Sequence, residues 1–185
     1  MNLYTLLIML SALYSGCKKI NQDELTTDSI IKYVESVNNK TLKETVFDFN
    51  DEYKEDDALG VVNIGSSEIT SYSEDGNILK IKVSYNGSHG NLTTTIFCKA
   101  GKAVFIRKNL ETFDPPKYEK GSRIKDKIWN EYFVLDKKIL EFRNNGGPIR
   151  FNKPDQLDLT TKFYELIKDF ESYMRIIKSR ESMLD

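Results

Sequence analysis

Three segments in the middle of the chain share one pattern, and this repeat limits the possible folds more than any other feature. Residues 72–82, 97–107 and 133–143 align without gaps. Each starts with an aromatic residue, has a tight-turn pair three positions later, a branched apolar residue at seven and a basic residue at ten. Asp75-Gly76 is typical of a two-residue hairpin turn, Ala100-Gly101 resembles it, and Asp136-Lys137 is weaker because Lys tolerates positive φ poorly. The repeat therefore predicts three β-hairpins.

The spacing of the hairpins indicates how they are connected. The segments begin at positions 72, 97 and 133, so the intervals are 25 and then 36 residues. An uneven interval favours an antiparallel meander over a solenoid. Glycine and proline place the connecting loops at 86–90 and 114–121.

Two-residue turns also predict which side chains share a face, because residues opposite one another in a ladder point the same way. The predicted core face collects Tyr72, Leu79, Ile81, Val83, Tyr85, Phe97, Val104, Ile106, Phe133, Leu135, Leu140 and Phe142. The predicted second face collects Lys80, Lys82, Ser84, Cys98, Phe105, Arg107, Glu141 and Arg143. Basic residues recur on this face, so we expect Lys80, Lys82, Arg107 and Arg143 to lie side by side. Such a face is either a solvated exterior or a binding surface for an acidic ligand or protein.

Two helices are expected to flank the meander. Residues 28–38 follow several N-capping side chains and place Ile30, Val34 and Val37 on one face. Apolar residues recur at intervals of three and four from 154 to about 179. A sheet with one apolar face needs a cover, so we expect the second helix to pack on it rather than bind a partner helix. The predicted fold class is α+β: an N-terminal helix, a curled antiparallel meander of about six strands and a long C-terminal amphipathic helix on one face, in a single domain over 27–180.

The N-terminus has the pattern of a secretory signal. Residues 3–14 are apolar and several residues shorter than a membrane-spanning helix requires. Ser15 and Gly16 directly before Cys17 resemble the lipobox of bacterial lipoproteins, although Tyr14 stands where that motif usually has Leu. By this resemblance, 1–16 is a signal peptide, Cys17 carries the lipid and 17–26 is a tether. A simple secretory signal and an N-terminal strand are the alternatives.

One hairpin phrase resembles a known group of sequences. Residues 131–142 (EYFVLDKKILEF) look like the aromatic-x-x-Asn/Asp-Gly-Lys-Leu-Ile hairpins of uncharacterised bacterial lipoproteins, with Lys137 in place of the usual Gly. Those chains share the layout of signal, helix, meander and closing helix, so the resemblance covers most of this chain. The group has no established activity, and the resemblance implies only a fold and a location in the cell envelope.

Composition argues against several functional classes. Lys plus Arg number 27 against 28 Asp plus Glu, without the basic excess of a nucleic-acid binder. With one His and two Cys, most His- or Cys-built catalytic and metal sites lack parts. The Ser88-His89 pair lies in a predicted turn, and if Cys17 is acylated the remaining thiol, Cys98, is expected to be a packed side chain. Residues 48–57 are acidic but lack EF-hand spacing, so we predict a solvated loop.

These observations predict no catalytic residue, no cofactor and no metal. The leading hypothesis is a non-enzymatic lipoprotein of the bacterial cell envelope, in the outer membrane or the periplasm, whose domain is a binding module. It would contact the membrane through Cys17 and an acidic partner through Lys80, Lys82, Arg107 and Arg143. The alternatives are an inhibitor or immunity protein against a secreted enzyme or toxin, and a hydrolase with an unrecognised carboxylate pair.

Overall fold

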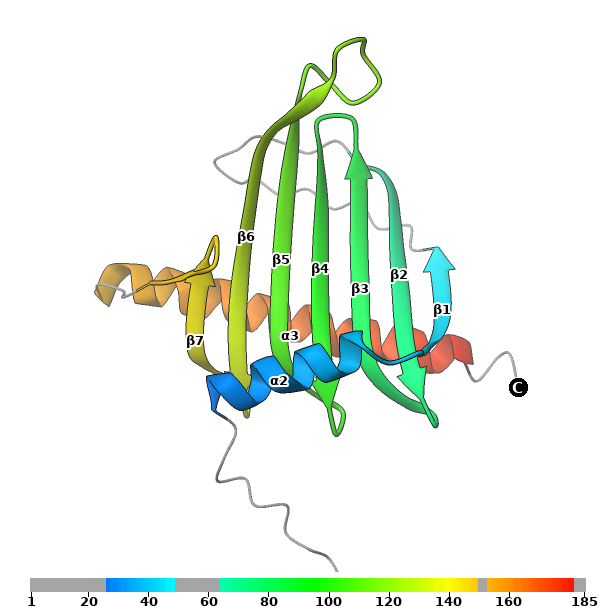
Figure 1. Ribbon diagram of the computed structural model, residues 1–185, viewed down its shortest axis with the longest axis vertical. Helices are drawn as coiled ribbons and strands as arrows, with labels where there is room; N and C mark the ends of the chain where they lie inside the picture. Colours follow the sequence, from blue (N-terminus) through cyan, green and yellow to red (C-terminus); the bar gives the residue numbers. More distant parts are fainter. Residues whose placement is uncertain (1–25, 49–63, 150–152, 182–185) are drawn as a thin grey trace, which may run out of the picture.

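One antiparallel sheet with a helix on each face forms the described part of the chain (Figure 1). The computed structural model describes the backbone of residues 26–48, 64–149 and 153–181, and the side chains of 26–48, 66–149 and 159–181. In these ranges eight strands follow one another in chain order across the sheet. The strands are β1 (Lys43–Asp48), β2 (Ile64–Glu74), β3 (Asn77–Gly87), β4 (Gly90–Lys99), β5 (Lys102–Asp114), β6 (Arg123–Leu135), β7 (Lys138–Asn144) and β8 (Gly147–Pro148).

The α+β class, the meander and both helices are confirmed, while the strand number and the curled shape are corrected. Three hairpins account for six strands, and β1 and β8 lie outside the repeat. In β1 only Phe47 is buried, so the sequence of this strand lacks the alternation of buried and exposed residues that predicts a strand. The sheet is open from β1 to β8. Because a helix covers each face, the sheet does not need to curl to bury its apolar residues.

The first helix, α2 (Thr27–Asn38), begins one residue before the predicted start at 28 and ends where predicted. The Thr26 side chain accepts a hydrogen bond from the Ser29 backbone N–H at 3.2 Å, which caps the helix. Ile30 and Val37 are fully buried against the sheet. The helix therefore covers one face at the lower end of the strands (Figure 1).

The second helix, α3 (Lys153–Glu181), covers the opposite face. Its buried residues follow the predicted spacing: Leu159, Phe163, Ile167, Phe170, Tyr173 and Ile177. The Phe163 ring stacks on Tyr132 of β6 with ring centroids 6.1 Å apart. The expectation that this helix packs on the sheet is therefore confirmed.

A β-bulge in each of the three hairpins changes the predicted division between the two faces. Leu79, Val104 and Leu140 are the extra residues, one per hairpin, so that Tyr72 lies opposite Lys80 instead of Leu79. One extra residue reverses the side to which all residues beyond it point. The prediction that Tyr72, Phe97 and Phe133 share a face with Ile81 and Ile106 was therefore wrong.

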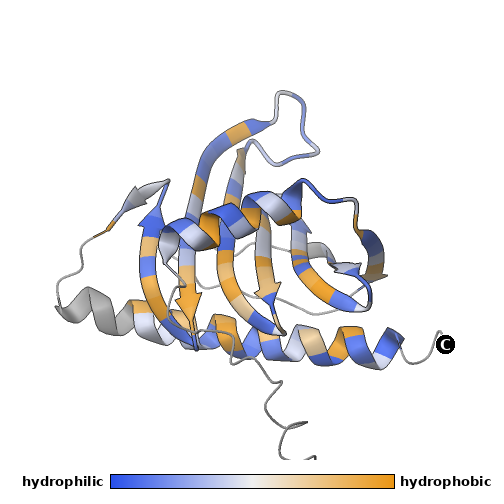
Figure 2. Cartoon of the chain, turned by 60° about the horizontal axis from the view of Figure 1, so that its bottom comes forward, coloured by the Kyte–Doolittle hydropathy of each residue, from blue (hydrophilic) through white to orange (hydrophobic). Residues whose placement is uncertain are grey.

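Both faces of the sheet contribute to a hydrophobic core, as Figure 2 shows for the strand segments next to the helices. On the α3 side the core includes Ile81, Val83, Tyr85, Cys98, Ile106 and Phe142. On the α2 side it consists of Ile30, Val37, Phe97, Val104, Phe105 and Phe133, with Leu79 packed against them. Cys98, which is predicted to lie on the second face, lies on the α3 side because of the bulge at Val104. Leu140, predicted to be core, is 43% exposed.

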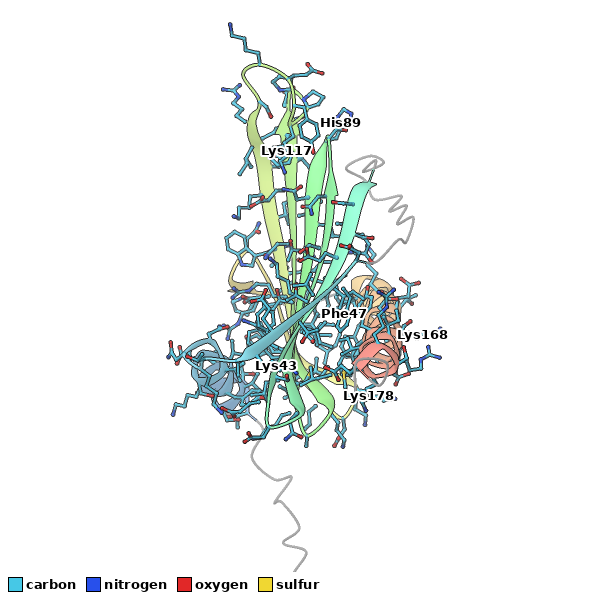
Figure 3. All side chains as sticks on the ribbon, turned by 90° about the vertical axis from the view of Figure 1, so that its right-hand side faces the viewer. Lys43, Phe47, His89, Lys117, Lys168 and Lys178 are labelled. Atoms are coloured by element: carbon cyan, nitrogen blue, oxygen red, sulfur yellow. The ribbon has the colours of Figure 1, made fainter. Side chains whose placement is uncertain are left out.

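The far end of the sheet extends beyond both helices (Figures 1 and 3). β5 and β6 are 13 residues each, and their connecting loop lies at the opposite end of the molecule from α2. In the ranges described, no helix has the length and apolar character needed to cross a membrane.

Candidate binding surface beside α2

Two rows of side chains cross the α2 side of the sheet, each formed by residues directly opposite one another on neighbouring strands. The aromatic row consists of Glu44, Tyr72, Lys80, Phe97, Phe105, Phe133 and Glu141. The polar row consists of Val46, Thr70, Lys82, Thr95, Arg107, Glu131 and Arg143. Because the rows are two residues apart along each strand, the polar row borders the aromatic row over the width of the sheet.

The aromatic row forms a packed floor under α2. The rings of Phe97 and Phe105 meet edge to face with centroids 5.8 Å apart, and those of Phe105 and Phe133 do so at 5.0 Å. All three are almost completely buried with Ile30 and Val37 of α2. Edge-to-face pairs fix the relative orientation of their rings. The floor therefore supports the charged residues beside it.

Three of the four predicted basic residues lie over aromatic rings. The Lys80 Nζ is 4.1 Å from the centroid of the Tyr72 ring, and the Arg143 Cζ is 4.7 Å from that of Phe133. Arg107 lies farther from its ring, with Cζ 5.7 Å from the Phe105 centroid. Cations within about 6 Å of a ring face are attracted by its quadrupole.

The two arginines are paired with carboxylates of the same surface. Arg107 Nε donates to Glu131 Oε1 at 2.9 Å, and Glu131 is only 6% exposed. Arg143 Nε donates to Glu141 Oε1 at 2.5 Å, and this hydrogen bond is the main reason why the pKa of Glu141 is lowered. The positive charges of both arginines are therefore largely balanced within the fold.

The two lysines differ from the arginines in this respect. Within the described part of the chain, no carboxylate lies in ion-pair distance of Lys80 or Lys82. Burial lowers the pKa of Lys80, an effect that the charge of Glu44 opposes and that of Lys82 increases. Burial also raises the pKa of Tyr72, as do the charges of Glu44 and Glu68. Lys80 and Lys82 therefore present positive charge for which the described residues supply no direct partner.

A pocket of about 170 Å³ lies between α2 and these strands. Its lining consists of Val34, Asn38, Tyr72, Lys80, Lys82, Thr95, Phe97, Phe105 and Arg107. The structure thus brings Lys80, Lys82 and Arg107 together around one pocket, while Arg143 lies outside its lining. The sequence pattern did not indicate the contributions of Asn38 and Thr95, which come from the helix and from the strand between β3 and β5.

The remaining predicted site residues show no catalytic arrangement. His89 is exposed in the β3–β4 turn, and the carbonyl oxygens of Ser88 and His89 accept hydrogen bonds from Lys117 and Phe113. Burial raises the pKa of the Cys98 thiol to about 12, so Cys98 is a poor nucleophile. No group of three or more potential metal ligands occurs in the residues that the structure describes. Cys17, the segment 1–25 and the predicted acidic loop after Asp48 lie outside those residues.

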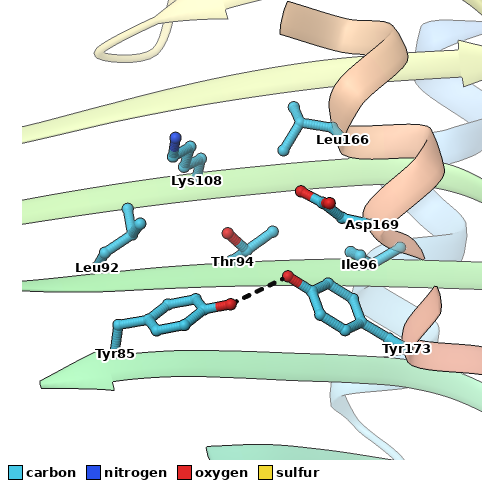
Figure 4. Close-up of a pocket in the computed structure, with 8 residues that line it drawn as sticks. All are labelled: Tyr85, Leu92, Thr94, Ile96, Lys108, Leu166, Asp169 and Tyr173. Carbon is cyan, nitrogen blue, oxygen red and sulfur yellow. Dashed lines mark hydrogen bonds between the residues drawn. The ribbon is translucent and has the colours of Figure 1, made fainter. Parts of the chain in front are cut away.

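Two other hollows are less suited to binding. A cavity of about 10 Å³ on the α3 side is lined by Tyr85 and Tyr173, whose hydroxyls lie 3.3 Å apart (Figure 4). It holds about one water molecule. A groove of about 410 Å³ lies between β7 and α3, but Ile149 and Leu159 in its lining flank residues 150–158, whose side chains are outside the described part.

No protein-family model, curated protein or solved structure matches this chain. The resemblance to uncharacterised lipoproteins therefore stays a prediction, and the function has to be argued from the site.

Proposed function

We propose that this protein is a non-enzymatic lipoprotein of the bacterial cell envelope, anchored through Cys17, whose domain binds an acidic ligand or protein beside α2. The observation that carries the binding proposal is the pair Lys80 and Lys82, which share one pocket with no carboxylate of the described residues within ion-pair distance. The anchor rests on the sequence around Cys17 alone.

The pocket combines charge recognition with an apolar wall. The ammonium groups of Lys80 and Lys82 attract an anion, and Thr95 and Asn38 offer hydrogen-bonding groups beside them. The buried rings of Phe97 and Phe105 add apolar surface to the lining, and a less aqueous surrounding strengthens electrostatic attraction. The arrangement therefore favours a carboxylate on a short apolar stem.

The size of the pocket limits what enters it. Its volume of about 170 Å³ is below the roughly 300 to 1,000 Å³ of sites for drug-sized ligands. One acidic side chain or a small anion fits this space better than a whole cofactor. The rest of a larger partner would lie on the open sheet surface beyond α2.

A titration with a hexaglutamate peptide tests the binding proposal. We expect amide chemical shifts at Thr95 and Lys82 to change on addition of the peptide at 20 mM salt, and the affinity to fall at least tenfold at 500 mM salt. The double variant Lys80→Gln/Lys82→Gln should lose at least tenfold in affinity. The control Lys102→Gln/Lys138→Gln changes the net charge equally at exposed positions outside the pocket. Equal weakening in both variants would show that the peptide responds only to net charge and would overturn the proposal.

Affinity capture from envelope extract then separates the two leading functions. The wild-type bait should recover one acidic partner that the Lys80→Gln/Lys82→Gln variant does not recover. Recovery of a secreted enzyme or toxin whose activity the chain suppresses would replace the binding module with the inhibitor alternative.

A further inference from the structure

The loop between β5 and β6 forms a projecting end of the molecule. We define the tip as residues 114–125, which project beyond the β3–β4 turn and lie farthest from α2 (Figure 1). In Figure 3, Lys117 and His89 lie at this end, while Lys43 and Lys178 lie at the other. The tip is therefore remote from the proposed binding pocket.

Backbone hydrogen bonds hold the tip in one conformation. Phe113 N–H donates to the His89 carbonyl at 2.8 Å, and Lys117 N–H donates to the Ser88 carbonyl at 2.7 Å, so the tip is fastened to the neighbouring β3–β4 turn. Within the loop, Glu119 N–H donates to Pro116 at 2.9 Å and Ser122 N–H to Glu119 at 3.1 Å. A preordered loop loses little conformational entropy when it binds.

The tip exposes two large apolar side chains. Tyr118 is 83% exposed and Ile124 is 50% exposed. Phe113 is half-buried below them, and the Lys117 Nζ lies 5.8 Å from the centroid of its ring. The fold therefore holds a tyrosine and an isoleucine in solvent at its outermost end.

Positive charge surrounds these apolar side chains. The tip contains four basic residues, Lys117, Lys120, Arg123 and Lys125, against Asp114 and Glu119, a net charge of +2 on a chain whose net charge is -1. All four basic residues are exposed. In the described ranges Lys120, Arg123 and Lys125 form no ion pair.

We propose that the tip binds the surface of an anionic lipid bilayer, with Tyr118 and Ile124 in the interfacial layer and the four basic residues at the lipid headgroups. Tyrosine is enriched at membrane interfaces, and exposed Lys and Arg are attracted to anionic lipids. Long basic side chains keep their charge in water while their stems lie against apolar material.

A protein partner fits these features less well. Lysine is depleted in protein interfaces, and a stable interface needs about 800 Å² from each partner, more than a narrow convex loop supplies. A bilayer has no such requirement, because a few side chains can partition into it.

Tryptophan fluorescence of the full-length chain tests this contact at the tip itself. In a Trp129→Phe background, the Tyr118→Trp variant places the single tryptophan at the tip, and the Tyr164→Trp variant places it at an exposed position of α3 as a control. The probes are vesicles of phosphatidylcholine with 30% phosphatidylglycerol, and vesicles of phosphatidylcholine alone, each with acyl chains brominated near the headgroup. An unchanged melting temperature confirms that each variant is folded.

We expect at least twofold quenching and a blue shift for the Tyr118→Trp variant on anionic vesicles, and neither for the Tyr164→Trp variant. The triple variant Lys120→Glu/Arg123→Glu/Lys125→Glu should abolish the quenching at 118. Failure of the chain to sediment with anionic vesicles, or sedimentation without quenching at 118, would overturn the proposal. If an envelope protein shields the fluorophore of the Tyr118→Trp variant from solvent and lipid does not quench it, the tip binds a protein partner instead.

Discussion

Arg107 lies directly opposite Glu131 across β5 and β6, and its guanidinium donates through Nε and Nη2 to the same carboxylate oxygen. Glu131 is 6% exposed, whereas the Arg107 side chain is 48% exposed. The buried carboxylate therefore depends on a cation that is itself half in solvent. Arg107 and Glu131 therefore belong to the polar row of the proposed binding surface and also contribute to the stability of the sheet.

Replacement of Arg107 by Leu should destabilise the fold by about 2 kcal/mol. Loss of one partner of a fully buried pair costs about 3 to 5 kcal/mol and exposed pairs contribute less than about 1 kcal/mol, so a half-exposed cation lies between. Lys127→Leu is the matched control, because Lys127 pairs with Glu111 at 2.7 Å on the same two strands and is 55% exposed. Urea unfolding should show a loss below about 0.5 kcal/mol for the control.

The double variant Arg107→Leu/Glu131→Gln identifies the cause of this loss. Removing the buried charge should recover at least half of it, since the cost arises from an unpaired carboxylate. No recovery would mean that Arg107 acts through packing on Phe105 instead. For this reason, lysines rather than arginines are the residues to change in binding experiments.

The hairpins could be predicted from local turn chemistry, but the bulges could not. Asp75 and Gly76 have φ of 50° and 75°, and Asp136 and Lys137 have 46° and 62°, so the turns have the backbone that the sequence pattern predicts. A bulge breaks the alternation at one position only, so that Ile78 and Ile81, three residues apart, both pack on the α3 side. Because Leu79 is apolar and can be buried on either face, nothing in the alignment indicated a register shift between the two strands of a hairpin.

One signal in the sequence did indicate that both faces are buried. Residues 96–98 and 103–106 are continuous apolar runs, which are typical of strands covered on two sides. With that interpretation, α2 and α3 are expected on opposite faces. The pairing of Arg107 with Glu131 could not be predicted in this way, because Glu131 precedes the third repeat segment and has no counterpart in its pattern.

Lys137→Gly should stabilise the fold by about 0.5 kcal/mol. A left-handed conformation costs a non-glycine residue about 1 to 2 kcal/mol, and the greater chain entropy of glycine offsets about 0.5 to 1 kcal/mol of that gain. Lys137 also pairs with Glu171 at the surface, and Glu171→Gln measures that contribution separately. Calorimetry should show a melting temperature about 1 to 2 °C higher for Lys137→Gly.

The equivalent position of the first hairpin provides the reverse test. Gly76 has φ of 75°, and a Cβ atom added there would meet no other atom within 4 Å, so Gly76→Lys adds backbone strain without a clash. It should lower stability by about 1 kcal/mol. If Lys137→Gly and Gly76→Lys changed the stability equally and in the same direction, the positive φ at these positions would not explain the effects.

Cys17→Ser should release the protein from the membrane fraction into the soluble fraction. Each buried methylene of an acyl chain contributes about 0.8 kcal/mol, so several chains hold a protein firmly. The circular dichroism spectrum of the released protein should match that of the wild type, because Cys17 precedes the predicted domain of residues 27–180. Equal membrane retention of variant and wild type would contradict acylation at Cys17, and Cys98→Ala serves as the control for a general effect of thiol loss.

The buried thiol of Cys98 predicts a loss of stability at high pH. Burial raises the pKa of Cys98 from 9.0 to about 12, so the unfolded chain releases this proton at lower pH than the folded chain. The stabilising effect is complete below pH 9 and is lost as pH rises toward 12, at about 1.4 kcal/mol per pH unit. Between pH 8 and pH 10, urea unfolding should therefore show a decrease about 1.4 kcal/mol larger for the wild type than for Cys98→Ala. Ionisation of the other tyrosines cancels in this difference, whereas the pKa of Tyr33 is raised by burial and, to a smaller extent, by the charge of Cys98. Identical pH profiles would show that the Cys98 thiol ionises in the folded state as readily as in the unfolded one.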